Sequence, residues 1–130
     1  PAYMASTDVF ATASVTEVHP LSVIEALASG LPVVGIQSPG VGDTVEDGVT
    51  GYLAPEEDLA VFTAKLSRII TDHEARKQMS LNAREVSLTY SIENTTQIMI
   101  DRYQKLYHEY SGKKQNFFQR LARPFRRAKT

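Results

Sequence analysis

The stretch Thr16-Glu17-Val18-His19-Pro20-Leu21-Ser22-Val23-Ile24-Glu25-Ala26-Leu27-Ala28-Ser29-Gly30-Leu31-Pro32-Val33-Val34 decides the fold of this 130-residue chain. Pro20 suits the first turn of a helix, because the N–H that it lacks would have no partner there. Gly30 supplies a stop and Pro32 prevents continuation. The sequence therefore predicts a short helix over residues 21–29, followed by a buried strand over residues 33–36.

One narrow polar strip runs along this predicted helix. Ser22, Glu25 and Ser29 share it by the spacing of three and four residues, whereas apolar side chains cover most of the remaining circumference. We therefore expect a largely buried helix on which Glu25 faces either water or a ligand. From periodicity alone, a solvated surface glutamate is the commoner of these two outcomes.

The run from Glu17 to Val34 resembles the signature of the group 1 glycosyltransferases, which are retaining enzymes of the GT-B fold with two glutamates separated by seven residues. Residues 3–10 resemble the strand and turn that precede the family's motif. Residues 38–55 resemble its glycine loop, acidic residue and "DG-x-TG-x-L-x-P" ending. The resemblance covers roughly residues 1–110. It implies an α/β fold, a Rossmann-like parallel sheet with flanking helices, that forms the later part of the nucleotide-sugar half of a GT-B enzyme.

The resemblance also implies a donor site. Glu17 would hold the donor sugar and act in catalysis, and Glu25 would bind the ribose, since a carboxylate accepts charge-assisted hydrogen bonds from two adjacent hydroxyls. The diphosphate would lie at the amino end of the predicted helix, where the N–H groups of Leu21 and Ser22 and the helix dipole favour an anion. The donor would be a UDP- or GDP-sugar. No cofactor or metal is expected, because no cluster of His, Asp or Glu has the spacing of a metal site.

Two departures from the family pattern bear on this site. His19-Pro20 stands where many members have an aromatic residue and glycine, so one backbone N–H is absent at Pro20. His19 is a candidate donor-binding residue in its place, although a lone histidine is more often structural. Gly40 follows a proline where the family often has two glycines. It either lets the nucleotide approach the backbone or forms a plain surface turn. Asp43 is expected to hydrogen-bond to the N–H groups of this loop.

Beyond the motif the sequence predicts three helices. Acidic residues 56–58 occupy the first turn of one helix, Asp72 caps a second that runs to about Val86, and Ser91 begins a third that Ser111-Gly112 ends. The apolar positions that recur at helical spacing in the first two helices are Leu59, Phe62, Leu66, Ile69, Ile70, Met79, Ala83 and Val86.

The body of the chain is acidic and its C-terminal tail is basic. Residues 113–130 hold seven of the 14 Lys and Arg residues and none of the 15 acidic ones, so the net charge is −8 before this tail and +7 within it. As a helix, the tail would place phenylalanines opposite arginines, the pattern of an interfacial helix on an anionic membrane surface. A solvated extension is the alternative. Nucleic-acid binding is disfavoured, because an acidic body repels a phosphate backbone.

Composition adds a further expectation about location. The sequence has no cysteine, and no apolar run approaches the roughly 20 residues of a membrane-spanning helix. We therefore expect a cytoplasmic protein, peripheral at the inner face of the membrane, with residues 1–110 as a partial donor domain and residues 111–130 as a basic tail.

The predicted function is the donor-binding part of a retaining glycosyltransferase that moves a hexose to a lipid or glycan hydroxyl. The resemblance leaves the acceptor-binding N-terminal domain outside this chain, so the chain alone should not transfer sugar. Two alternatives stay open. One is a non-catalytic α/β interaction module, which His19-Pro20 favours, and the other is a sugar-nucleotide epimerase of the same fold.

Overall fold

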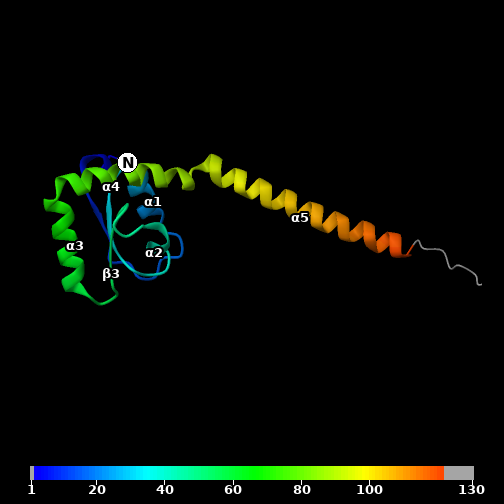
Figure 1. Cartoon of the computed structure of the whole chain (residues 1–130), viewed down its shortest axis with the longest axis horizontal. Coiled ribbons are helices and arrows are strands. Elements are labelled where there is room, and N and C mark those ends of the chain that lie inside the picture. Colours follow the sequence, from blue (N-terminus) through cyan, green and yellow to red (C-terminus); the bar gives the residue numbers. More distant parts are fainter. Residues whose placement is uncertain (1, 122–130) are drawn as a thin grey trace, which may run out of the picture. The chain divides into compact units, whose positions relative to one another are not determined.

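The computed structural model describes the backbone of residues 2–121 and the side chains of residues 2–111 (Figure 1). The described chain divides into two compact units, with the boundary between Ser91 and Ile92. The first unit is an α/β domain, and the second contains one helix.

A parallel sheet of three strands, in the order β1-β2-β3, forms the centre of the first unit. The strands are β1 (Phe10–Ala11), β2 (Val33–Ile36) and β3 (Gly51–Ala54). Helices α1 (Leu21–Ala28) and α2 (Val41–Thr44) provide the two crossovers between them. The α/β fold and the strand at residues 33–36 are therefore confirmed. All four residues of β2 are buried, as expected for a strand with a neighbour on each side.

Side chains alternate between the two faces of the sheet and feed two apolar clusters. Val33 and Leu53 belong to the cluster under α1 and α2, and Val34 and Tyr52 to the cluster under α3 (Leu59–Thr71) (Figure 1). Helix α4 (His73–Ser87) serves both. The first cluster comprises Val23, Ala26, Leu27, Leu31, Val33, Val41, Val45, Leu53 and Ala83. The second comprises Val34, Tyr52, Ile69 and Met79.

The predicted cap of α4 at Asp72 is confirmed. The prediction that acidic residues 56–58 occupy the first turn of α3 is wrong, because α3 begins at Leu59 and Asp58 is its N-cap. The Asp58 carboxylate accepts a hydrogen bond from the Val61 N–H, and the Asp72 carboxylate one from the Ala75 N–H, both at 2.9 Å. Short 3₁₀ turns, η1 (Met4–Ser6) and η2 (Leu88–Tyr90), lie before β1 and after α4. Among the apolar positions predicted by periodicity, Leu59 and Ile70 are exposed, because they lie at the margins of the stripe that α3 turns to the sheet.

The expectation of a largely buried α1 is wrong. Val23, Ala26 and Leu27 are buried, but Leu21 is 62% exposed and Ala28 is also exposed. The helix covers one face of the sheet as an outer layer, so only the side that meets the strands loses contact with water. Glu25 is exposed on the other side, as predicted.

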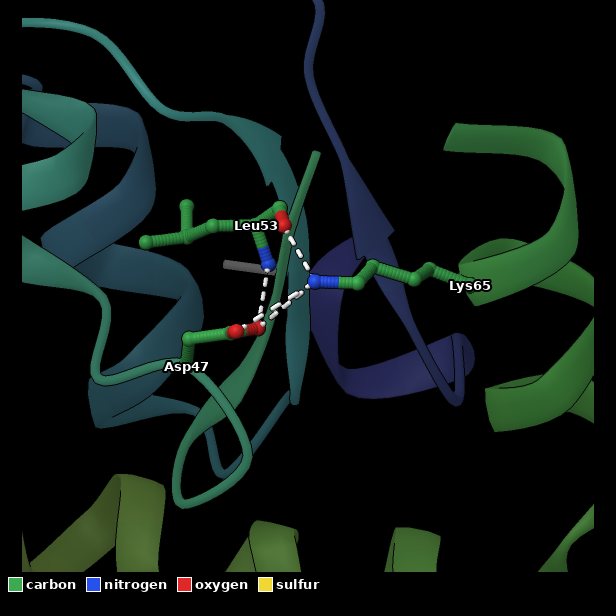
Figure 2. A network of polar contacts seen from close by, with 3 residues as sticks. All are labelled: Asp47, Leu53 and Lys65. Carbon is green, nitrogen blue, oxygen red and sulfur yellow. Dashed lines mark hydrogen bonds and ion pairs between the residues drawn. The ribbon is translucent and has the colours of Figure 1, made fainter. Parts of the chain in front are cut away.

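The outer edge of β3 is closed by side chains (Figure 2). The Asp47 carboxylate accepts a hydrogen bond of 2.8 Å from the Leu53 N–H, and the Lys65 amine donates to the Leu53 carbonyl. Lys65 also pairs with Asp47 at 3.2 Å. Both backbone groups of Leu53 that face away from β2 are thereby satisfied, and another strand cannot pair with them.

Helix α5 (Ile92–Leu121) forms the second unit, and the prediction that Ser111-Gly112 ends it is wrong. A glycine inside a helix costs only about 0.5–1 kcal/mol relative to alanine, and Lys113, Lys114 and Gln115 beyond it favour helix. The backbone of the predicted tail is thus helical to Leu121. The side chains of residues 113–121 and all of residues 122–130 lie outside the described residues, so the interfacial face stays a prediction. No helix in the described part has the length and apolarity needed to cross a membrane.

Candidate functional site

Three loops follow the carboxyl ends of the parallel strands, the edge at which open α/β sheets bind ligands. Glu17 lies in the loop after β1, Gly40 in the loop after β2, and residues 55–58 follow β3. Glu17 is half-buried, whereas Glu25, on the second turn of α1, is exposed. The fold therefore places the predicted sugar-binding carboxylate at the edge where the chemistry is expected.

Two serines hold the Glu17 loop. The Ser14 hydroxyl donates to Oε1 of Glu17 at 3.0 Å, and the buried Ser38 hydroxyl lies 3.2 Å from the Ser14 carbonyl oxygen. The Glu17 carboxylate is thus connected through Ser14 to the end of β2. Neither serine was predicted as a site residue, although a serine three residues before a glutamate is a visible signal for such a bond.

Gly40 supports Glu17 from the neighbouring loop. Its φ is +81°, and a Cβ at this position would overlap the Glu17 carbonyl oxygen and lie 2.9 Å from the carbonyl carbon. The Gly40 N–H donates to the Asp43 carboxylate at 3.0 Å, which confirms the predicted role of Asp43. In the described contacts Gly40 serves the packing of Glu17. Its contact with a donor stays a prediction.

The amino end of α1 offers one free amide. The Pro20 carbonyl accepts from the N–H groups of Val23 and Ile24, and the Leu21 N–H donates to the His19 carbonyl at 2.9 Å. Within the described residues the Ser22 N–H has no hydrogen-bond partner. Of the two amides predicted to meet the diphosphate, that of Ser22 is therefore available, and that of Leu21 would first have to leave His19. The His19 side chain is exposed.

A cavity of about 410 Å³ opens at the same edge of the sheet, lined by Ala13, Val15, Ile36, Phe62 and residues 56–59. A larger one, of about 690 Å³, lies at the opposite, amino-terminal edge. Neither cavity is lined by Glu17 or Glu25, so the candidate site consists of the loops that carry these carboxylates and not of either cavity. Among the side chains that the structure describes, no three acidic or histidine residues lie close enough together to bind a metal ion.

Comparison with known proteins relates the chain to one family of enzymes. Residues 1–86 match the model of the family described as glycosyl transferases group 1. A glycosyltransferase of Haemophilus influenzae is 38% identical over 92 residues, and a D-inositol 3-phosphate glycosyltransferase of Saccharomonospora viridis is 33% identical over 105 residues. These alignments cover 70% and 81% of the chain but only 26% and 24% of the two relatives. The chain therefore spans about a quarter of the length of the curated relatives it matches.

Solved structures show the same fold. Sucrose-phosphate synthase of Thermosynechococcus elongatus superposes with a TM-score of 0.74 at 28% identity, covering 82% of this chain and 27% of that protein. HepE of Anabaena, determined in complex with UDP-glucose, superposes with a TM-score of 0.68 at 24% identity, covering 79% of this chain and 29% of HepE. The three-stranded sheet and its helices are thus a portion of a GT-B glycosyltransferase fold.

Proposed function

Because the chain belongs to the group 1 glycosyl transferases, we propose that it is the donor-binding part of a retaining enzyme. This enzyme transfers a hexose from a UDP- or GDP-sugar to a hydroxyl of a lipid or glycan. The observation that carries the proposal is the Glu17 carboxylate, held at 3.0 Å by Ser14 at the carboxyl edge of a parallel sheet.

Each site residue has one task in this proposal. Glu17 accepts hydrogen bonds from the donor sugar, and Glu25, exposed on α1, accepts them from the ribose. The Ser22 N–H and the positive end of α1 meet the diphosphate, with Leu21 adding its N–H after release from His19. His19 and Gly40 border the donor from the two loops.

The reaction needs no protein nucleophile. The acceptor hydroxyl oxygen attacks the anomeric carbon on the face from which the diphosphate departs, and the bond from that carbon to the phosphate oxygen breaks. The hydroxyl proton passes to the departing diphosphate oxygen. The protein contributes by stabilising the charge that develops on this leaving group, which the amides at the start of α1 are placed to do.

The acceptor side is proposed to come from a further, N-terminal domain, since the chain spans about a quarter of its relatives. The isolated chain should accordingly bind nucleotide sugar weakly and transfer none. Sugar transfer by the purified 130-residue chain would contradict this part of the proposal.

The site assignment is tested in the complete enzyme with two variants. Glu25→Ala should raise the donor KM and Glu17→Ala should lower kcat. Each loses a charge-assisted hydrogen bond worth about 1.5–3 kcal/mol, or roughly ten- to a hundredfold. Exposed Glu74→Ala on α4 is the matched control. Kinetics unchanged in both site variants would remove the assignment.

The same enzyme, incubated with nucleotide sugars and a lipid extract, separates the alternatives. Transferred sugar supports the proposal, an epimerised donor indicates a sugar-nucleotide epimerase, and an unchanged donor indicates an interaction module. Pro20 is the residue that favours the module, because it removes one amide from the diphosphate-binding end of α1.

We further propose that the basic tail, residues 113–130, holds the enzyme at the inner, anionic surface of the membrane, where a lipid acceptor would lie. Each basic residue near such a surface contributes on the order of 1 kcal/mol, and the tail has seven. Co-sedimentation with neutral and anionic vesicles, at low and high salt, should show binding of the full-length protein but not of a version that ends at Gly112. Equal partitioning of the two would remove the tail from the mechanism.

A further inference from the structure

A second cavity lies away from the proposed donor site. It has a volume of about 690 Å³, within the range of about 300–1,000 Å³ that is usual for small-molecule sites. Its walls come from three segments of the first unit: residues 4–8 before β1, residues 28–31 between α1 and β2, and α4. Because two of these segments precede strands, the cavity opens at the edge of the sheet opposite Glu17.

The side chains that line the cavity carry more positive than negative charge. Helix α4 contributes His73, Arg76, Lys77 and Arg84 to the lining, and Asp8 is the single acidic residue in it. Counting the lining side chains with histidine neutral gives three positive charges against one negative. The hydroxyls of Ser80 on α4 and Ser29 at the end of α1 add neutral polar groups to the same walls.

One of the three cations is already engaged. Nη1 of Arg76 donates to the carbonyls of Ile69 and Ile70 at 3.0 and 2.7 Å, and Nη2 lies 2.6 Å from Nδ1 of His73. A guanidinium can only donate, so Nδ1 of His73 accepts and the ring carries its proton on Nε2. Arg76 thereby orients His73 with a ring N–H left to donate, while its own charge stays at the cavity wall.

The other two cations are open donors. Within residues 2–111, neither the Lys77 amine nor the Arg84 guanidinium has a hydrogen-bond or ion-pair partner. Arg84 nevertheless has a defined place, because it crosses Gly30, where a Cβ would overlap its Nε atom. Lys77 and Arg84 are seven residues apart on one helix, so they project from the same side of α4, two turns apart.

We propose that this cavity binds a phosphomonoester, with Lys77, Arg84 and the ring N–H of His73 as its ligands. A dianionic phosphate offers three oxygens that can accept from the Lys77 amine and the Arg84 guanidinium, and arginine matches its geometry with two parallel bonds. His73, a further turn along α4, donates its ring N–H to the esterified part of the ligand. The phosphate can belong to a free metabolite or to a lipid headgroup. This site is independent of the donor site, because it shares none of Glu17, Ser22 and Glu25.

Calorimetric titration of the chain with glycerol 3-phosphate tests whether the cavity binds a free phosphomonoester. Lys77→Gln and Arg84→Gln should each weaken binding about tenfold, corresponding to about 1.4 kcal/mol, whereas Lys77→Arg should preserve it. The matched control is Arg68→Gln on α3, which removes the same charge from an exposed side chain that lies over the Tyr52 ring. Melting curves confirm that each variant keeps the fold.

Vesicles of phosphatidylcholine, with and without phosphatidic acid, test whether the cavity binds the phosphate of a lipid headgroup. If the Gln variants reduce binding to phosphatidic acid vesicles while glycerol 3-phosphate does not bind, the phosphate is a headgroup. If they reduce glycerol 3-phosphate binding, it is a free molecule. The proposal is overturned if neither probe binds, or if Arg68→Gln weakens binding as much as the cavity variants, which would indicate net charge alone.

Discussion

Ser14 is the residue whose contact says most about Glu17. Its hydroxyl is 3.0 Å from the carboxylate, so it fixes the orientation of the group that we assign to the donor sugar. In the complete enzyme we expect Ser14→Ala to lower kcat about tenfold, the effect of one lost charge-assisted hydrogen bond, with the donor KM little changed. Ser14→Thr, which keeps the hydroxyl, should retain most of the turnover.

The kinetics of the Ser14 variant show whether only the role of Ser14 is wrong or the whole site assignment is wrong. Exposed Ser6, which bonds to the Tyr3 carbonyl in η1, is the control for loss of a serine hydroxyl. If Glu17→Ala abolishes turnover while Ser14→Ala leaves it unchanged, Ser14 has no positioning role, although the site stands. If neither variant changes turnover, the site itself is wrong.

Comparing Gly40 with Gly48 separates the cost of a clash with Glu17 from the cost of the left-handed backbone. Both have positive φ, +81° and +80°, but a Cβ at Gly48 would have nothing within 4 Å, whereas one at Gly40 would overlap the Glu17 carbonyl. We expect Gly48→Ala to cost about 1–2 kcal/mol of unfolding free energy, the cost of left-handed backbone for alanine. Gly40→Ala should cost more, about 3 kcal/mol.

Urea denaturation measures both glycine variants on the same chain. Equal losses at the two positions would mean that the Gly40 loop moves away from Glu17 without cost, and that Gly40 does not support the site.

At the scale of elements, the β3 edge shows how an open sheet is protected. The Leu53 N–H is buried and bonds to Asp47, so Asp47→Ala leaves that donor without a partner and should cost about 1–3 kcal/mol of unfolding free energy. Lys65→Ala loses the ion pair and the hydrogen bond to the Leu53 carbonyl. It should cost less, because the pair is 27% and 50% exposed on its two sides and contributes about 0.2–1 kcal/mol, and water can replace the amine at the carbonyl once the lysine side chain is removed.

Asp47→Asn distinguishes the hydrogen bond from the ion pair in the same denaturation experiment. The asparagine carbonyl can still accept from Leu53, so this variant should retain most of the stability that Asp47→Ala loses. An Asn variant as unstable as the Ala variant would show that the charge, not the acceptor, stabilises the edge.

Local signals predicted most elements. Pro20, Gly30 and Pro32 located α1 and β2, and Asp72 located the start of α4, since each signal acts within one turn of the helix that it starts or stops. The acidic residues 56–58 indicated α3 but placed its start too early. Contacts between distant segments were not predictable in this way. Ser38 reaches Ser14 across 24 residues, because the parallel sheet brings together the loops after β1 and β2. Lys65 reaches Leu53 across 12 residues, because α3 packs against β3.

The site shows the same division between local and distant information. The motif makes Glu17 and Glu25 candidates for the site, and turn chemistry predicted the hydrogen bond of Asp43. The engagement of the Leu21 N–H with His19 could not, because it depends on how the chain turns at Pro20. At Gly112 the local signal itself was misleading, since the cost of one glycine is small against the helix-forming residues that follow.

For the whole molecule, the distribution of the core decides what can fold alone. Every buried apolar residue of the described chain lies between Pro20 and Ala83, so the first unit has a complete core of its own. We therefore expect a chain ending at Ser91 to unfold cooperatively, with a melting temperature close to that of the 130-residue protein.

A second truncation, ending at Thr71, is the control. It removes α4 and with it Met79 and Ala83, one residue from each apolar cluster. Loss of such buried side chains leaves both clusters open to water, so this shorter chain should lack a cooperative transition in thermal unfolding followed by circular dichroism. If the chain ending at Ser91 also lacked that transition, the first unit would depend on residues 92–130 for its fold, and its clusters would not suffice as a core.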